Sequence, residues 1–177
     1  MRKTRKLVFM ALLTAISLVI WVIEAQIPPP VPVPGVKLGL ASVVTLTAML
    51  LLGRKEALAV LLVRVFLSAV FAGSFSAILF SLTGGVLSWA VMALLIKPFS
   101  GRLEWVVSVF GAIAHNAGQL LAAIAVTGTP SLVSFAPVLL ASAIVTGAFT
   151  GVAAMYLHRA LRGRIEFGKD ETNEDRP

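Results

Sequence analysis

A stripe of polar and small side chains in the fifth apolar stretch holds the residues best suited to binding chemistry. The stripe recurs every three or four residues and consists of Ser108, Gly111, Ala112, His115, Gly118, Gln119 and Ala122, with Asn116 adjacent. Residues at this spacing share one face of a helix, and a polar face is costly against lipid. We therefore predict that His115, Asn116 and Gln119 line a ligand site. The alternative is that His115 is only hydrogen-bonded to a neighbouring helix.

A single arginine, Arg64, lies near the middle of the third apolar stretch. A guanidinium in hydrocarbon is expensive unless it finds a partner, so we expect Arg64 to face the interior. Its helical face also carries Ala57, Leu61 and Ser68. Two uses are open, namely contact with an anionic or carbonyl-rich ligand, or pairing with a structural acceptor such as Glu24 or helix-end carbonyls. Lys37 is a further candidate for ligand binding, with a solvated charge at the level of the lipid head groups as the alternative.

Small residues mark faces on which helices can approach closely. Ala11 and Ala15 form such a pair in the first apolar stretch and are a possible docking face for a partner, with internal packing as the alternative. Gly147 and Gly151 repeat the spacing in the sixth stretch, where we favour internal packing. The pair Gly84–Gly85 in the fourth stretch indicates either a packing notch or a local unwinding.

A proline-rich strap, residues 26–35, follows the first apolar stretch and holds five prolines. Proline removes a backbone donor and favours extended polyproline geometry, so the strap cannot be helical. It either caps a pocket between helices or acts as a rigid connector between them.

The elements that must position these residues are helices within a membrane. The 177 residues are 58% hydrophobic and only 13% charged, with a mean hydropathy of +0.96, which is unlike a soluble domain. Six apolar stretches are long enough to cross a bilayer or nearly so. They are Leu7 to Ile23, Val36 to Leu52, Ala57 to Ala72, Ser76 to Ile96, Trp105 to Val126 and Ser134 to Leu157. The predicted fold is an all-α integral membrane protein, a six-transmembrane-helix bundle over residues 1–160.

The distribution of positive charge predicts the orientation of this bundle. Of the 15 Lys and Arg residues, all but Lys37 and Arg64 fall before the first stretch or after an even-numbered one. By the positive-inside rule both termini are cytoplasmic, as an even number of crossings requires. The predicted location is the cell membrane, with residues 161–177 as a charged, disordered cytoplasmic tail. Because topology explains the net charge of +7, no nucleic-acid partner is expected.

Several chemistries lack the residues they need. The chain has no cysteine, no phosphate-binding Gly-x-x-x-x-Gly-Lys-Ser/Thr loop, no His-Glu-x-x-His motif and no aspartate-rich metal motif. We expect no cofactor, no metal site and no enzymatic activity of its own. The predicted role is binding, with energy supplied by a partner.

Several motifs together resemble one family. They are the Ala11/Ala15 pair, Pro34 to Ala41, Arg64 to Ser68, Gly73-Ser-Phe, Gly84-Gly85 and Gly111 to Gln119. Over about residues 5 to 160 the chain resembles the family labelled Gx transporter or heptaprenyl diphosphate synthase component I, and more broadly the substrate-binding S components of energy-coupling factor (ECF) transporters. The catalytic units of prenyl diphosphate synthases carry two aspartate-rich motifs, which this chain lacks.

The S-component resemblance implies a function. Ala11 and Ala15 would dock on a transmembrane coupling subunit, an ATPase pair would drive the cycle, and the strap would be a lid over a small-molecule substrate lined by Arg64, His115, Asn116, Gln119 and Lys37. An isoprenoid-like or other cofactor precursor is the expected substrate. The alternatives are a non-catalytic membrane accessory subunit in prenyl diphosphate or quinone metabolism, or a structural partner in a redox membrane complex.

Overall fold

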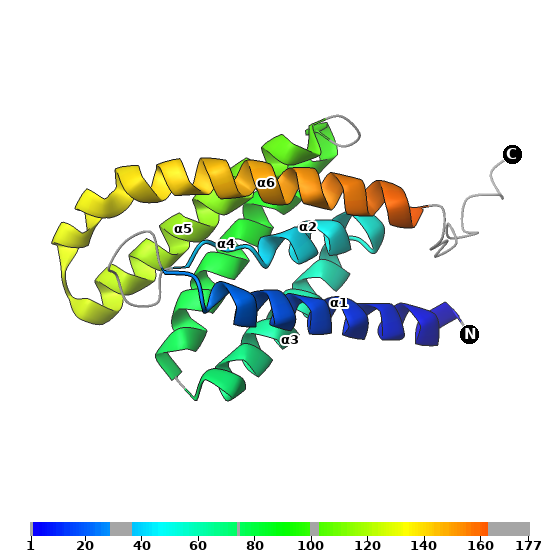
Figure 1. Cartoon of the computed structure of the whole chain (residues 1–177), viewed down its shortest axis with the longest axis horizontal. Helices are drawn as coiled ribbons and strands as arrows, with labels where there is room; N and C mark the ends of the chain where they lie inside the picture. The colour runs from blue at the N-terminus through cyan, green and yellow to red at the C-terminus, as the bar shows by residue number, and fades with distance from the viewer. Residues whose placement is uncertain (1, 29–36, 74, 100–102, 163–177) are drawn as a thin grey trace, which may run out of the picture.

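The computed structural model describes residues 2–28, 37–73, 75–99 and 103–162, and within these residues every regular element is helical. The elements are α1 (Arg2–Glu24), α2 (Ser42–Leu51), α3 (Arg54–Ala72), α4 (Phe75–Phe99), α5 (Glu104–Thr127), the short 3₁₀ helix η1 (Pro130–Phe135) and α6 (Ala136–Arg162). Figure 1 shows them as one bundle in which α1, α2 and α6 run across the other three helices. The predicted all-helical fold is confirmed. Most of the strap and residues 163–177 of the predicted tail lie outside the described residues.

Four helical segments of the described chain are long and apolar enough to cross a membrane. They are Lys3–Glu24, Ile78–Phe99, Glu104–Thr127 and Pro130–Leu161. Large apolar side chains on the surface agree with this, since Phe71, Leu94 and Val145 are 70% exposed or more, as a lipid-facing surface requires. The chain is therefore a membrane protein.

The second and third predicted crossings differ from these four. Helix α2 has ten residues and is only about 15 Å long at 1.5 Å per residue. Helix α3 has 19 residues but carries charges at Arg54, Lys55, Glu56 and Arg64. A count of six crossings stays a prediction.

The chain before α2 is not helical, although the sequence predicted a helix from Val36. The turn at Leu40 and Ala41 follows Gly39, which has a φ of +77°. A side chain at Gly39 would be strained by this φ, and its Cβ would lie 2.9 Å from Cδ2 of His115. Gly39 therefore lets the chain pass directly over the His115 ring, and α2 starts only afterwards.

Helix α5 packs between α4 and α6 through glycines. A Cβ on Gly118 would lie 2.7 Å from the carbonyl oxygen of Thr83, and a Cβ on Gly147 or Gly151 would lie 2.6 Å from a backbone Cα of α5. At these glycines the helices approach so closely that only a hydrogen atom fits in place of a side chain. Internal packing of Gly147 and Gly151 is confirmed, and Gly84–Gly85 is a packing notch within continuous helix.

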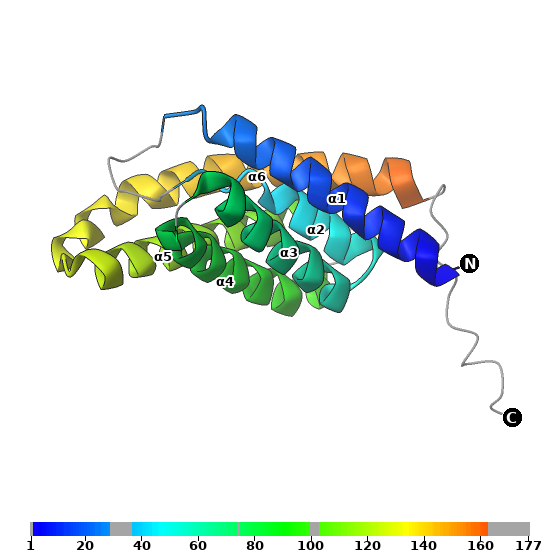
Figure 2. The same ribbon diagram turned by 90° about the horizontal axis from the view of Figure 1, so that it is seen from below.

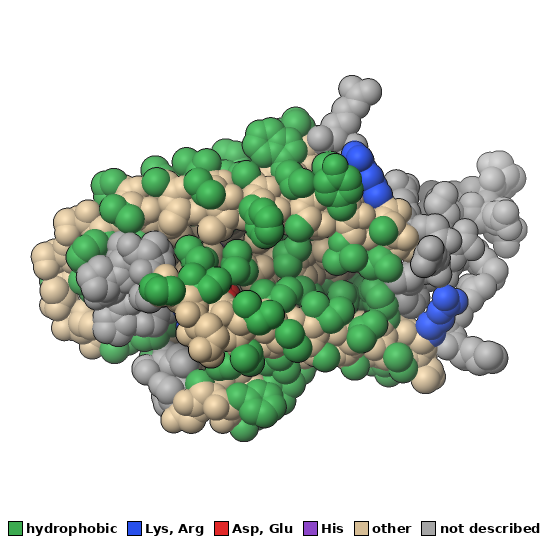
Figure 3. Space-filling model, viewed as in Figure 1, with side chains coloured by type: hydrophobic (Ala, Val, Ile, Leu, Met, Phe, Trp, Pro, Cys, Tyr) green, Lys and Arg blue, Asp and Glu red, His purple; other side chains and the backbone are tan. Residues whose placement is uncertain are grey.

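The start of α1 and the end of α6 lie at the same end of the molecule in both ribbon views (Figures 1 and 2). Two polar contacts join helices there, an ion pair between Lys6 and Glu56 and a contact of 3.4 Å between Nδ1 of His158 and Oε1 of Glu104. On the face seen in Figure 3, the visible Lys and Arg side chains gather at this end and hydrophobic side chains cover much of the rest. We call it the basic end.

Candidate functional site

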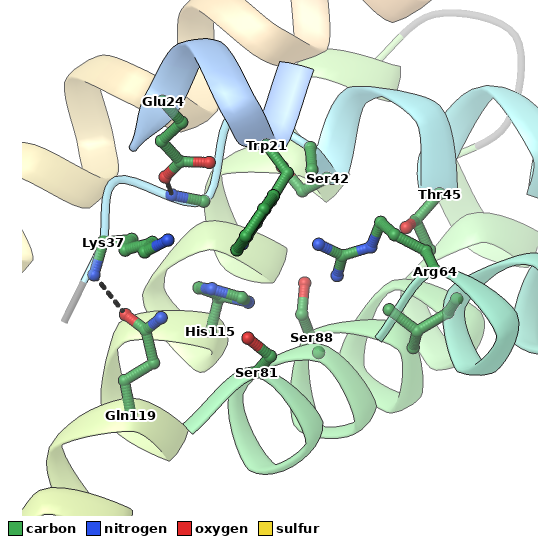
Figure 4. Close-up of a pocket in the computed structure, with 14 residues that line it drawn as sticks. Trp21, Glu24, Lys37, Ser42, Thr45, Arg64, Ser81, Ser88, His115 and Gln119 are labelled. Atoms are coloured by element: carbon green, nitrogen blue, oxygen red, sulfur yellow. Dashed lines mark hydrogen bonds between the residues drawn. The ribbon is translucent and has the colours of Figure 1, made fainter. Parts of the chain in front are cut away.

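A small cavity lined by polar side chains lies among α1, α3, α4 and α5, beside the start of α2 (Figure 4). Its volume is about 20 Å³, which is enough for a water molecule or a small ion. It is lined by Trp21, Glu24, Lys37, Gly39, Ala41, Ser42, Thr45, Leu61, Arg64, Ser81, Gly85, Ser88, His115 and Gln119. We call it the polar cavity.

Arg64 projects into the polar cavity from α3, and its predicted interior face is confirmed. Its side chain is 6% exposed, and Ala57, Leu61 and Ser68 on the same face are 2% exposed or less. Within the described residues no carboxylate lies within 4 Å of the guanidinium, although the charge of Glu24 acts on it from farther away. Its Nε is buried and has no hydrogen-bond partner. The structure therefore shows no direct pairing of Arg64 with Glu24.

Glu24 instead holds the connector to α2. Its carboxylate is 4% exposed and accepts a hydrogen bond from the backbone N–H of Gly39. Because Glu24 ends α1 and Gly39 precedes α2, this bond fixes the connector across the top of the cavity.

Both the backbone and the side chain of Lys37 contact residues that line the polar cavity. Its N–H donates to Oε1 of Gln119 at 3.1 Å, and its Nζ lies 4.5 Å from the centroid of the Trp21 ring, a cation–π distance. Burial lowers the pKa of Lys37 below its ordinary value of 10.5, while the charge of Glu24 opposes this shift. Lys37 is half-buried, so it is not a fully solvated head-group-level charge.

His115 and Gln119 line the cavity from α5, one turn apart, as predicted, and both are buried. The imidazole also lies close to Gly84 in α4, because a Cβ on Gly84 would be 3.2 Å from Cε1 of His115. A Cβ on Gly84 would lie 2.9 Å from both Cγ of Gln119 and the carbonyl oxygen of His115. Gly84 therefore allows α4 to pack closely against His115 and Gln119, because a side chain at this position would collide with both residues.

Asn116 is not part of the polar cavity, in contrast to its predicted grouping with His115 and Gln119. Its Nδ2 donates to the carbonyl oxygen of Leu139 at 2.9 Å and to Oγ of Ser142 at 3.4 Å. One residue along a helix turns the side chain by about 100°, which points Asn116 at α6. Its observed contacts join α5 to α6.

Apart from Glu24, which was considered as an acceptor for Arg64, the contribution of α1 to the cavity was not predicted from the sequence. Trp21 and Glu24 lie on one helical face with Thr14 and Ser17, and the three polar members are at most 7% exposed. A spacing of three and four residues from Thr14 to Glu24 was the signal that could have revealed this face. The buried hydroxyl of Ser88 in α4 also lines the cavity and lacks a hydrogen-bond partner.

Ala11 and Ala15 lie away from the cavity. Both are exposed on α1, on a surface that includes Leu12 and Ile16, which are 55% and 42% exposed. They therefore do not serve internal packing, and a partner or lipid can reach them.

A second hollow runs along the outside of α5 and α6. It has a volume of about 400 Å³ and is lined by Ile113, Asn116, Ala117, Leu120, Ala136, Pro137, Leu139 and Leu140. Almost all of these side chains are apolar, so this α5–α6 groove suits a hydrocarbon chain. In the described part of the chain no three His, Asp or Glu side chains come together to hold a metal ion.

Comparison with known proteins gives one result. A family model described as heptaprenyl diphosphate synthase component I matches residues 13–157, a range that contains every residue discussed above for the polar cavity. Searches of curated proteins and of solved structures each found no match. The chain belongs to the heptaprenyl diphosphate synthase component I family.

Proposed function

We propose that this protein is a membrane substrate-binding subunit that binds a polar group of a small molecule at the polar cavity and is driven by a partner, as in S components of ECF transporters. The observation that carries the proposal is that buried polar atoms in the cavity lack a hydrogen-bond partner. Arg64 and Ser88 both line the cavity, and each has a buried polar atom without a partner. Such atoms are costly unless a ligand or water engages them.

The arrangement of the helix ends supports uptake from outside the cell. In the proposed topology six crossings leave the basic end in the cytoplasm. The cavity residues Glu24 and Lys37 come from the end of α1 and the connector to α2, which are at the opposite end of α1 from Lys6. The polar cavity would then lie in the outer half of the membrane, accessible to an external solute.

The exposed pair Ala11 and Ala15 supports a partner on α1. Small residues allow a second helix to approach closely, and both are near the proposed cytoplasmic side. A transmembrane coupling subunit would dock there and an ATPase pair would supply the energy.

The test is purification of the tagged full-length protein from its native membrane in mild detergent, followed by native mass spectrometry. We expect a retained small molecule, and co-purification of an ATPase pair with a second membrane subunit. The variant Ala11→Leu/Ala15→Leu should lose these partners but keep the small molecule. Absence of both the small molecule and the ATPases would refute the proposal.

A second candidate is a non-catalytic membrane component that assists prenyl diphosphate synthesis. It is favoured by the description of the family and by the α5–α6 groove, whose apolar walls could hold an isoprenoid chain. In this case a soluble prenyl synthase would co-purify in place of the ATPases. Its product length or rate would change when the membrane subunit is added.

A further inference from the structure

We infer that the polar cavity is a subsite for a single carboxylate group, so that the captured solute is a monocarboxylic acid. This inference rests on the proposed binding function and names the class of ligand. It depends on three features of the cavity, namely its charge, its free donors and the absence of a phosphate cradle.

The charges of the side chains that line the cavity do not sum to zero. Arg64 and Lys37 are cations, and Glu24 is the one acid among the lining residues. Counting Glu24 as ionised and His115 as neutral, the cavity carries one net positive charge. Arg64 and Lys37 also repel each other. A bound monoanion would neutralise the site, whereas a dianion would leave an uncompensated negative charge in a buried place.

The available donors match a carboxylate. Nε of Arg64 is buried and unpartnered, as is Oγ of Ser88. An arginine that offers Nε together with a terminal nitrogen presents two parallel N–H groups, the geometry that binds both oxygens of a carboxylate. The Glu24 carboxylate is occupied by the N–H of Gly39 and lies beyond ion-pair distance of Arg64. Arg64 is therefore left for a ligand.

A phosphate is disfavoured because its usual backbone donors are already used. Phosphate sites draw on free N–H groups at a helix N-terminus, and α2 does begin beside the cavity. However, the amides of Ser42, Val43 and Val44 already donate to three preceding carbonyl oxygens, those of Gly39, Leu40 and Ala41.

The experiment compares formate, the smallest carboxylate, with formamide, its neutral counterpart. The full-length protein in phosphatidylcholine nanodiscs is unfolded by heating over a concentration series of each compound, with sodium chloride added to the formamide arm to match ionic strength. We expect formate to raise the unfolding temperature progressively, because it binds only the folded state, and formamide to have no such effect.

Four variants test whether formate binds in the polar cavity. Arg64→Gln should weaken formate binding by about tenfold or more, since a charge-assisted bond contributes roughly 1.5–3 kcal/mol. Glu24→Gln keeps an acceptor for Gly39 but removes the negative charge, so it should strengthen formate binding. Ser88→Ala, a milder change in case Arg64→Gln does not fold, should weaken binding severalfold. Arg159→Gln, at the exposed end of α6, is the control and should match the wild type.

Equal effects of formate and formamide on the wild type would overturn the carboxylate subsite, even if native mass spectrometry found a bound neutral molecule and so upheld the proposed function. Opposite changes in formate affinity for Arg64→Gln and Glu24→Gln would support the subsite, and identical changes would overturn it. Discs containing phosphatidylglycerol separate a soluble acid from an anionic lipid head group. Loss of the formate effect in those discs would overturn a soluble ligand.

Discussion

Replacing Gly118 with alanine should destabilise the bundle where α4 crosses α5. A Cβ at this position would lie 2.7 Å from the carbonyl oxygen of Thr83 and 2.8 Å from Cα of Gly84. Both atoms belong to the backbone, so no side chain can rotate away to relieve the contact. To reach the 3.4 Å at which ordinary contact begins, the helices must separate by about 0.7 Å.

The expected net loss is up to about 2 kcal/mol. Overpacking of this kind costs roughly 1–3 kcal/mol, while alanine in place of glycine within a helix returns about 1 kcal/mol. Gly85→Ala is the matched control, because its Cβ would meet only Cδ1 of Leu61 at 2.9 Å, the end of a flexible side chain. The control should be neutral or slightly stabilising.

The measurement is the free energy of unfolding from SDS titration in mixed micelles, read by far-UV circular dichroism. Gly118→Ala should also weaken formate binding, because Gly84 supports His115 and Gln119 in the polar cavity. If Gly118→Ala were as stable as Gly85→Ala, the close approach of α4 and α5 would be refuted, because both variants gain the same helix propensity.

Three further predictions concern other parts of the molecule. The hydrogen bond from Lys6 lowers the pKa of Glu56 below its ordinary value of 4.5, so the pair should stabilise the fold above pH 4.5 and lose this effect as the pH falls through the lowered pKa. With both side chains partly exposed the effect should stay below about 1 kcal/mol, and Glu56→Gln should remove it from the pH profile of SDS unfolding. Asn116→Leu should cost about 1 kcal/mol by breaking the link from α5 to α6, yet leave formate affinity unchanged in the nanodisc assay. Ala11→Leu/Ala15→Leu should leave the free energy of unfolding within about 0.5 kcal/mol of the wild type, because exposed sites tolerate substitution; a larger loss would place these alanines inside the fold.

Much of this architecture can be predicted from local sequence. The apolar stretches predicted all six α-helices, because a backbone in hydrocarbon must satisfy its own hydrogen bonds. Arg64 could be assigned to the interior for a similar reason, since a guanidinium cannot face lipid without a large cost. The four-residue period also placed His115 and Gln119 on one face of α5.

The boundaries of α2 and the membership of the cavity could not be predicted in this way. Sequence hydrophobicity extended the second helix to Val36, whereas the bond from Gly39 to Glu24 keeps the chain before Ser42 out of the helix. This bond depends on α1 lying beside the connector, which no local pattern encodes.

The sequence by itself determined which segments are helical, which helix ends carry the positive charge and which polar residues must avoid lipid, because each of these follows from the cost of placing a group in hydrocarbon. Only the tertiary structure decided that Glu24 and Trp21 join Arg64 in the cavity while Asn116 turns toward α6. The reason is that a residue's partners are set by how far each helix is rotated against its neighbours. In this bundle, glycines at the α4–α5 and α5–α6 crossings fix that rotation by admitting one close approach.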